Sequence, residues 1–162
     1  MDEPNRVLAI AAASGRVGHV FFSGGRLRHW SISRKASRNG VAAVEIVQTW
    51  INRLKPNVVV TEALGKSRKG DRSKAVTAAI GRIAAQNYLL DIAVERVRRF
   101  ENKYLEARAL AEEFPEIGLW LPKARRLWET EPRSAIYIDA LVLAKQVIDG
   151  APNGTNATTT SN

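Results

Sequence analysis

The chain has 162 residues, 45% of them hydrophobic, and a formal net charge of +9, which suits one domain with a buried core and a polyanionic partner such as nucleic acid. It contains no cysteine and two histidines, so disulfides and thiolate or histidine-rich metal sites are excluded, and a bound metal would have oxygen ligands, as Mg²⁺ or Mn²⁺ prefers. No apolar run approaches the roughly twenty residues of a membrane span and the first residues are acidic instead of signal-like, so we expect a cytoplasmic protein without membrane contact.

The first third of the chain predicts an antiparallel meander followed by a helix. Three strand signals span residues 7–13, 17–22 and 27–32, and short glycine-containing turns join them. Apolar residues then recur at helical spacing over residues 40–54 and stop before Pro56, which predicts an amphipathic helix.

The middle of the chain alternates strands and helices. Residues 58–62 form a short, continuously apolar run that is typical of a strand buried on both faces. A helix is predicted over residues 73–87 and a fifth strand over residues 89–97. Helix, strand, helix, strand is a crossover pattern, so the fourth and fifth strands should be parallel.

The C-terminal part predicts two more helices and a tail. Helical periodicity spans residues 103–114 and 134–148, with an irregular segment between them. Residues 151–162 consist largely of Asn, Thr, Ser and Gly, so we expect a disordered tail after a single α/β domain over residues 1–150.

Glu62 and many cations are predicted to meet at one edge of the sheet. If the first and third strands run parallel to the fourth and fifth, the segments that leave these four strands emerge together. A carboxylate at the end of a buried strand with cations beside it is what a metal-assisted phosphodiester site needs. The cations expected to contact phosphates are Arg34, Lys35, Arg38, Lys66, Arg68, Lys69, Arg72 and Lys74, together with Arg125 and Arg126 before the last helix.

The order of elements resembles the ribonuclease H-like fold, and its details resemble RuvC-type Holliday junction resolvases over residues 6–148. Three short motifs carry the resemblance: Leu8-Ala9-Ile10-Ala11 in the first strand, Val58-Val59-Val60-Thr61-Glu62 in the fourth strand and Ile138-Asp139-Ala140-Leu141 in the last helix. The resemblance implies a mixed five-stranded sheet flanked by helices, with three antiparallel strands followed by two parallel crossover strands. It also implies Mg²⁺- or Mn²⁺-dependent endonuclease chemistry on duplex or branched DNA, with Glu62 and Asp139 as metal ligands.

Two positions depart from the resolvase pattern. Ala11 stands where the family has a catalytic aspartate, and Ile136 stands where resolvases often have a further acid. With Glu62 and Asp139 alone, we expect slow or absent hydrolysis. Ala11 is compatible with a natural loss of catalysis that keeps binding, and equally with an engineered alanine variant of a nuclease.

Two functions of different classes therefore remain open. The first is a RuvC-like DNA-binding protein of nuclease ancestry that uses a metal if Glu62 and Asp139 cooperate. The second is a non-catalytic DNA- or RNA-binding or scaffold module that uses the same basic edge without metal. Under the plainest interpretation Glu62 pairs with Arg68 or Arg72 and Asp139 is only a polar helix residue. A homodimer, common among resolvases, would suit a two-fold junction.

Overall fold

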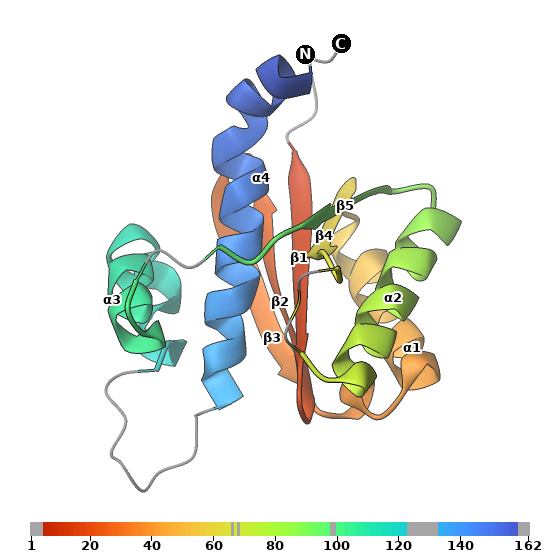
Figure 1. Ribbon diagram of the computed structural model, residues 1–162. Helices are drawn as coiled ribbons and strands as arrows, with labels where there is room; N and C mark the ends of the chain where they lie inside the picture. The colour runs from red at the N-terminus through yellow and green to blue at the C-terminus, as the bar shows by residue number, and fades with distance from the viewer. Residues whose placement is uncertain (1–4, 66, 68, 98–99, 123–132, 159–162) are drawn as a thin grey trace, which may run out of the picture.

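A five-stranded mixed sheet forms the centre of the molecule (Figure 1). The computed structural model describes residues 5–65, 67, 69–97, 100–122 and 133–158. Strands β1 (Arg6–Ala13), β2 (Arg16–Ser23) and β3 (Arg26–Ser33) form the expected antiparallel meander. Strands β4 (Val58–Glu62) and β5 (Leu90–Val94) continue the sheet in parallel with β1, in the order β3-β2-β1-β4-β5. The predicted sheet is confirmed.

Helices cover both faces of the sheet. Helices α1 (Gly40–Leu54) and α2 (Asp71–Gln86) lie on one face, and α4 (Ile136–Thr158) crosses the other (Figure 1). Helix α3 (Lys103–Glu113) lies outside α4 and leads into a short 3₁₀ helix at Pro115–Trp120. Among the described residues, none of the helices combines the length and the hydropathy needed to cross a membrane.

Strand β1 is buried on both faces because its alternating side chains serve two cores. Leu8 and Ile10 pack into the core beneath α1 and α2, whereas Ala9 and Ala11 pack into the core beneath α4. All six residues from Val7 to Ala12 are buried. The small side chains on the α4 side allow that helix to lie close to the strand.

The C-terminal ends of strand β5 and helix α4 differ from the predicted ends. Strand β5 ends at Val94 and not at Val97, because its partner β4 ends at Glu62, which is the residue paired with Val94. Helix α4 extends to Thr158, whereas the predicted helix ends at Ile148. Disorder of the tail from Ala151 onward stays a prediction, and residues 159–162 lie outside the described part of the chain.

Candidate functional site

The strand register brings Ala11 and Glu62 to the same level at one edge of the sheet. Ala9 pairs with Val60 across β1 and β4, so the positions two residues further along lie side by side. Ala11 and Val60 belong to the core under α4, and alternation along β4 puts Glu62 on that same face. Asp139 lies in the first turn of α4, which packs over β1. The two acidic residues therefore approach each other from different elements.

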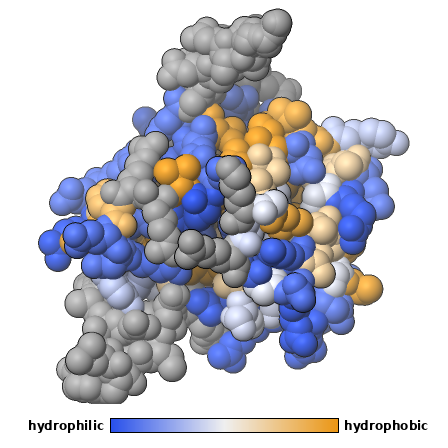
Figure 2. Space-filling model, viewed as in Figure 1, coloured by the Kyte–Doolittle hydropathy of each residue, from blue (hydrophilic) through white to orange (hydrophobic). Residues whose placement is uncertain are grey.

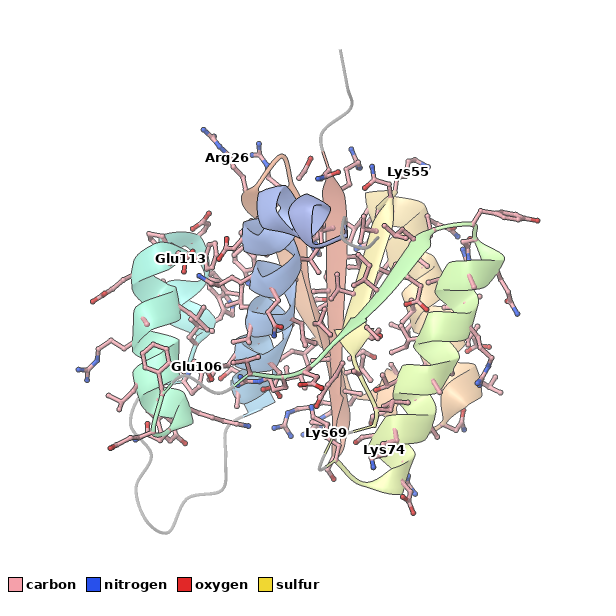
Figure 3. All side chains as sticks on the ribbon, turned by 45° about the horizontal axis from the view of Figure 1, so that its top comes forward. Arg26, Lys55, Lys69, Lys74, Glu106 and Glu113 are labelled. Carbon is pink, nitrogen blue, oxygen red and sulfur yellow. The ribbon has the colours of Figure 1, made fainter. Side chains whose placement is uncertain are left out.

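An ammonium group joins the two carboxylates. The Nζ atom of Lys69 lies 3.4 Å from Oδ2 of Asp139 and 3.7 Å from Oε1 of Glu62. The same Nζ donates a hydrogen bond of 2.6 Å to the backbone carbonyl oxygen of Ala12. Lys69 belongs to the segment between β4 and α2, and its side chain lies at the lower end of the sheet in Figure 3. One lysine thus contacts β1, β4 and α4 together.

Arg96 occupies the other side of Asp139. Its Nε donates to Oδ1 of Asp139 at 2.9 Å. Its two terminal nitrogens donate to the carboxylate of Glu106 at 2.7 and 3.2 Å, in the forked geometry that arginine and carboxylate favour. Asp139 and Glu106 are each only 6% exposed, so Arg96 connects two buried acids on α4 and α3.

These contacts keep Asp139 ionised. Burial raises the pKa of Asp139, but the positive charges of Lys69, Arg96 and Lys103 and the hydrogen bond from Arg96 outweigh burial and hold this pKa below its usual value. For Arg96, burial lowers the pKa, while the hydrogen bonds that it donates to Glu106 and the negative charge of Asp139 raise the pKa above its ordinary value. The cluster is therefore a set of fixed, mutually neutralising charges.

The residues of this cluster do not fit a divalent metal ion. Ala11 is 2% exposed and offers no oxygen donor from its side chain. Ile136, three residues before Asp139, packs so closely over β2 that a Cβ atom on Gly18 would lie 2.7 Å from its Cγ2 atom. Within the described ranges, acidic and histidine side chains form no group of three that could hold a metal. Lys69 supplies the positive charge between Glu62 and Asp139 instead.

Exposed cations surround this edge of the sheet. Arg34, Lys35 and Arg38 follow β3 and are exposed, and Arg72 in the first turn of α2 is also exposed. The turn after β3 contacts α2, so these cations lie near one another. Figure 3 shows Lys74 beside Lys69 at this end, whereas Arg26 and Lys55 lie at the opposite end.

Not every predicted cation can be placed in this basic group. Lys66, Arg68, Arg125 and Arg126 lie outside the described residues. Lys69, predicted to contact phosphate, instead points into the acidic pair. Among the described residues, Glu62 pairs with Lys69 and not with Arg72, while Arg68, the other alternative partner, lies outside them.

Neither Glu106 nor Arg96 is among the site residues predicted from the sequence. A signal for Glu106 does exist. It shares the buried side of α3 with Ala107 and Leu110, and an acidic residue on an apolar helix face requires a buried partner. Nothing in the sequence identifies that partner, because Arg96 reaches Glu106 across two elements.

The two histidines form a separate polar pair under α1. His19 Nε2 and His29 Nδ1 are 3.1 Å apart, and the ring of His19 packs against Trp50 with a centroid distance of 4.2 Å. Burial, with the charges of His29 and Arg53, lowers the pKa of His19 to about 3. His19 therefore stays neutral at pH 7 and packs as a core residue.

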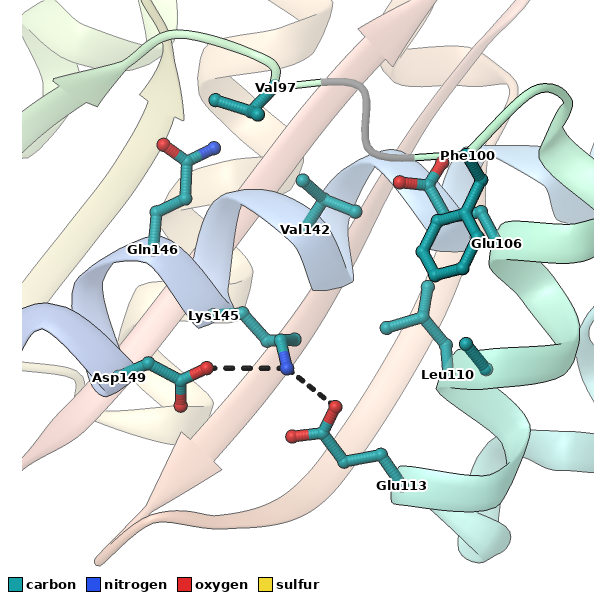
Figure 4. A pocket seen from close by; sticks show the side chains of 10 residues that line it. Val97, Phe100, Glu106, Leu110, Glu113, Val142, Lys145, Gln146 and Asp149 are labelled. Carbon is teal, nitrogen blue, oxygen red and sulfur yellow. Dashed lines mark hydrogen bonds and ion pairs between the residues drawn. The ribbon is translucent and has the colours of Figure 1, made fainter.

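A cavity of about 510 Å³ lies between α3, α4 and the segment after β5 (Figure 4). Its apolar wall includes Phe100, Leu110 and Val142. Its charged lining residues are engaged with protein partners: Glu106 with Arg96, and Lys145 with both Glu113 and Asp149. Among the described lining residues, only Glu106 also belongs to the acidic cluster, which consists of Glu62, Asp139 and Glu106 with Lys69 and Arg96. The acidic cluster and the basic edge, and not this cavity, therefore form the candidate site.

Solved structures with this architecture were found, although no family model and no characterised protein matches the chain by sequence. The RuvC structure from Thermus thermophilus aligns with a TM-score of 0.60 and 18% identity, over 93% of this chain and 97% of that one. T. thermophilus RuvC in complex with a Holliday junction substrate aligns with a TM-score of 0.57 at the same identity and coverage. The yeast mitochondrial Holliday junction resolvase Ydc2 aligns with a TM-score of 0.51 and 12% identity, over 89% and 78% of the two chains. The chain therefore has a ribonuclease H-like fold of the RuvC type.

Proposed function

We propose that the protein binds duplex or branched DNA through its phosphates, at the sheet edge where β3 ends and α2 begins, and does not cut it. The observation that carries this proposal is the group of exposed cations Arg34, Lys35, Arg38 and Arg72 around the acidic cluster. The likeness to RuvC in complex with a Holliday junction supports branched DNA as the partner.

Phosphate contact explains this surface better than base recognition. The exposed cations at this edge are arginine and lysine side chains, which bind phosphate oxygens without reading sequence. Each phosphate neutralised releases counterions, so the affinity should fall steeply with salt. With the net charge of +9, the protein should also be attracted to DNA over a long range.

Absence of hydrolysis follows from the chemistry of the acidic cluster. Phosphodiester cleavage of the RuvC type would need carboxylates that are free to hold metal ions. Here both oxygens of Asp139 face cations of the protein, and Ala11 contributes no carboxylate. We therefore favour the non-catalytic alternative over a slow metal-dependent nuclease.

The test compares two double variants that each remove one arginine and one lysine. Lys35→Ala/Arg38→Ala alters the proposed binding edge, and Arg26→Ala/Lys55→Asn alters the opposite end of the sheet (Figure 3). Fluorescence anisotropy with a four-way junction, a duplex and single-stranded RNA should give a Kd about tenfold higher for the first variant and a salt slope lower by about two. The second variant should change binding by less than about threefold.

Two results would reject this function. Equal weakening by both variants would indicate a diffuse basic surface, and failure of the unaltered protein to bind any of the three nucleic acids would exclude DNA or RNA as partner. Gels of the same mixtures with Mg²⁺ or Mn²⁺ should show intact DNA. Light scattering of the same samples measures the homodimer, which we include in the proposal because a four-way junction offers two-fold symmetry.

A further inference from the structure

Lys69 has surroundings that resemble those of a bound cation more than those of a surface lysine. Its ammonium meets three oxygens from three elements: the carbonyl of Ala12 on β1, Glu62 on β4 and Asp139 on α4. The side chain of Lys69 is 23% exposed, and those of Glu62 and Asp139 are 13% and 9% exposed. The two carboxylates are therefore largely removed from water, and Lys69 is the cation that they share, while Arg96 also pairs with Asp139.

We propose that Lys69 is a built-in cation that takes the place a divalent metal would occupy between Glu62 and Asp139. The protein then holds its acidic pair together without Mg²⁺ or Mn²⁺. This inference deepens the proposed function, because it gives the physical reason why DNA would be bound and not cut. It is tested on the protein without DNA, so the two proposals can fail separately.

The charges around the pair support this assignment. Glu62, Asp139 and Glu106 provide three negative charges. Lys69 and Arg96 form ion pairs with them, and the positive charge of Lys103 acts on Asp139. The formal charges thus cancel before any ion is added. A divalent ion at this position would meet the ammonium of Lys69 at close range, and their repulsion would exclude it.

Apolar packing beside Glu62 and Asp139 also supports Lys69 as their cation. Ala11 and Ile136 belong to one buried apolar core, next to the level at which Glu62 and Asp139 meet Lys69. Hydrocarbon surroundings on this side strengthen the attraction between Lys69 and the two carboxylates. Lysine needs no water ligand and remains tethered to the chain.

Thermal unfolding of the full chain tests the inference. The unaltered protein, Lys69→Met and the control Arg82→Met are each unfolded in EDTA, Mg²⁺ and Mn²⁺ at matched ionic strength. Arg82 is an exposed residue of α2, so its replacement also removes one positive charge but leaves the acidic pair intact. The Tm of the unaltered protein should respond to neither metal.

Lys69→Met should lower the Tm in EDTA by about 3 to 8 °C, because two buried carboxylates lose their shared cation. Mn²⁺ should restore at least half of this loss, since the emptied position now presents two carboxylates and a carbonyl oxygen. Arg82→Met should shift the Tm by less than about 2 °C and should show no response to Mn²⁺.

The inference is overturned if Lys69→Met folds but its Tm does not rise in Mn²⁺. It is also overturned if Mn²⁺ raises the Tm of the unaltered protein and this rise is lost in Glu62→Gln. If Lys69→Met does not fold, electron paramagnetic resonance of Mn²⁺ with the unaltered protein decides. The spectrum of free Mn²⁺ should persist in the presence of the protein. Bound Mn²⁺ that is lost in Glu62→Gln would overturn the assignment.

Discussion

Asp139 shows how a buried carboxylate at this edge of the sheet is held by cations of the protein itself. The residue is 6% exposed, and its carboxylate oxygens face Lys69 and Arg96. A buried carboxylate without partners would take up a proton, whereas this one is held in the charged form by its neighbours. The residue type that a nuclease would use for metal binding thus serves here as the centre of an ion-pair cluster.

Asp139→Asn should destabilise the protein in a manner that depends on pH. The folded-state pKa of Asp139 lies below its unfolded value of about 3.9, so its contribution to stability is complete above that value and is lost as the pH falls below it. Urea unfolding at pH 7 should show a loss of about 2 to 4 kcal/mol in the free energy of unfolding. The difference between the two proteins should shrink below pH 4, and a difference that is constant with pH would contradict the charged role.

Ala11 and Lys69 differ in how far the sequence reveals them. That residue 11 is an alanine, which brings no carboxylate to this edge of the sheet, is visible from the sequence. The inward direction of Lys69 is not visible, because Lys69 stands in a run of cations that would all suit phosphate contact. Its direction is decided by the carbonyl of Ala12 and the two acids, which come from elements distant in the chain.

At the scale of elements, helical and strand periodicity predicts the sheet and the order of the helices. Residues 40–54 form α1 as predicted, since the side chain of Asn39 caps its start and Lys55 ends it with a left-handed backbone. Strand β5 is shorter than its apolar pattern, because pairing with β4 ends at Glu62. Local pattern thus identifies an element, and its neighbour sets its length.

Arg96 connects three elements and should control how firmly α3 is attached. It follows β5 and pairs with Asp139 on α4 and Glu106 on α3, while α3 has no strand of the sheet directly beneath it in Figure 1. Arg96→Met leaves Glu106 buried without its cation, so the amides of α3 should exchange with solvent at least about tenfold faster, and those of β1 should change less. Hydrogen exchange measures both, with the exposed Arg108→Met on α3 as the control.

If α3 keeps its protection in Arg96→Met, packing of its apolar residues and not the ion pair holds the helix. Equal acceleration in α3 and β1 would instead show that Arg96 stabilises the whole fold. The control should leave both segments unchanged, because Arg108 is exposed and lies away from the buried face of α3.

Over the whole molecule, the surface over β5 and the surface at the lower end in Figure 1 differ in character. Figure 2 shows hydrophobic surface over β5, where Leu90 is 58% exposed, and largely hydrophilic surface around the lower end of the molecule. The meeting of the exits from β1, β3, β4 and β5 at one edge follows from the strand directions and is confirmed. The strand topology predicts where the cationic residues gather, but it does not predict that Lys69 neutralises Glu62 and Asp139.

This difference predicts where DNA should contact the protein. In a titration of ¹⁵N-labelled protein with a four-way junction, amide shifts should change over residues 34–38 and 70–74 and stay constant around Arg26 and Lys55, at the opposite end (Figure 3). The shifts at the first end should return toward their free values when the salt is raised from about 50 to 200 mM, because counterion release drives the binding. Shifts spread evenly over both ends would mean that the net charge of +9 acts as a whole and that the sheet edge has no special role.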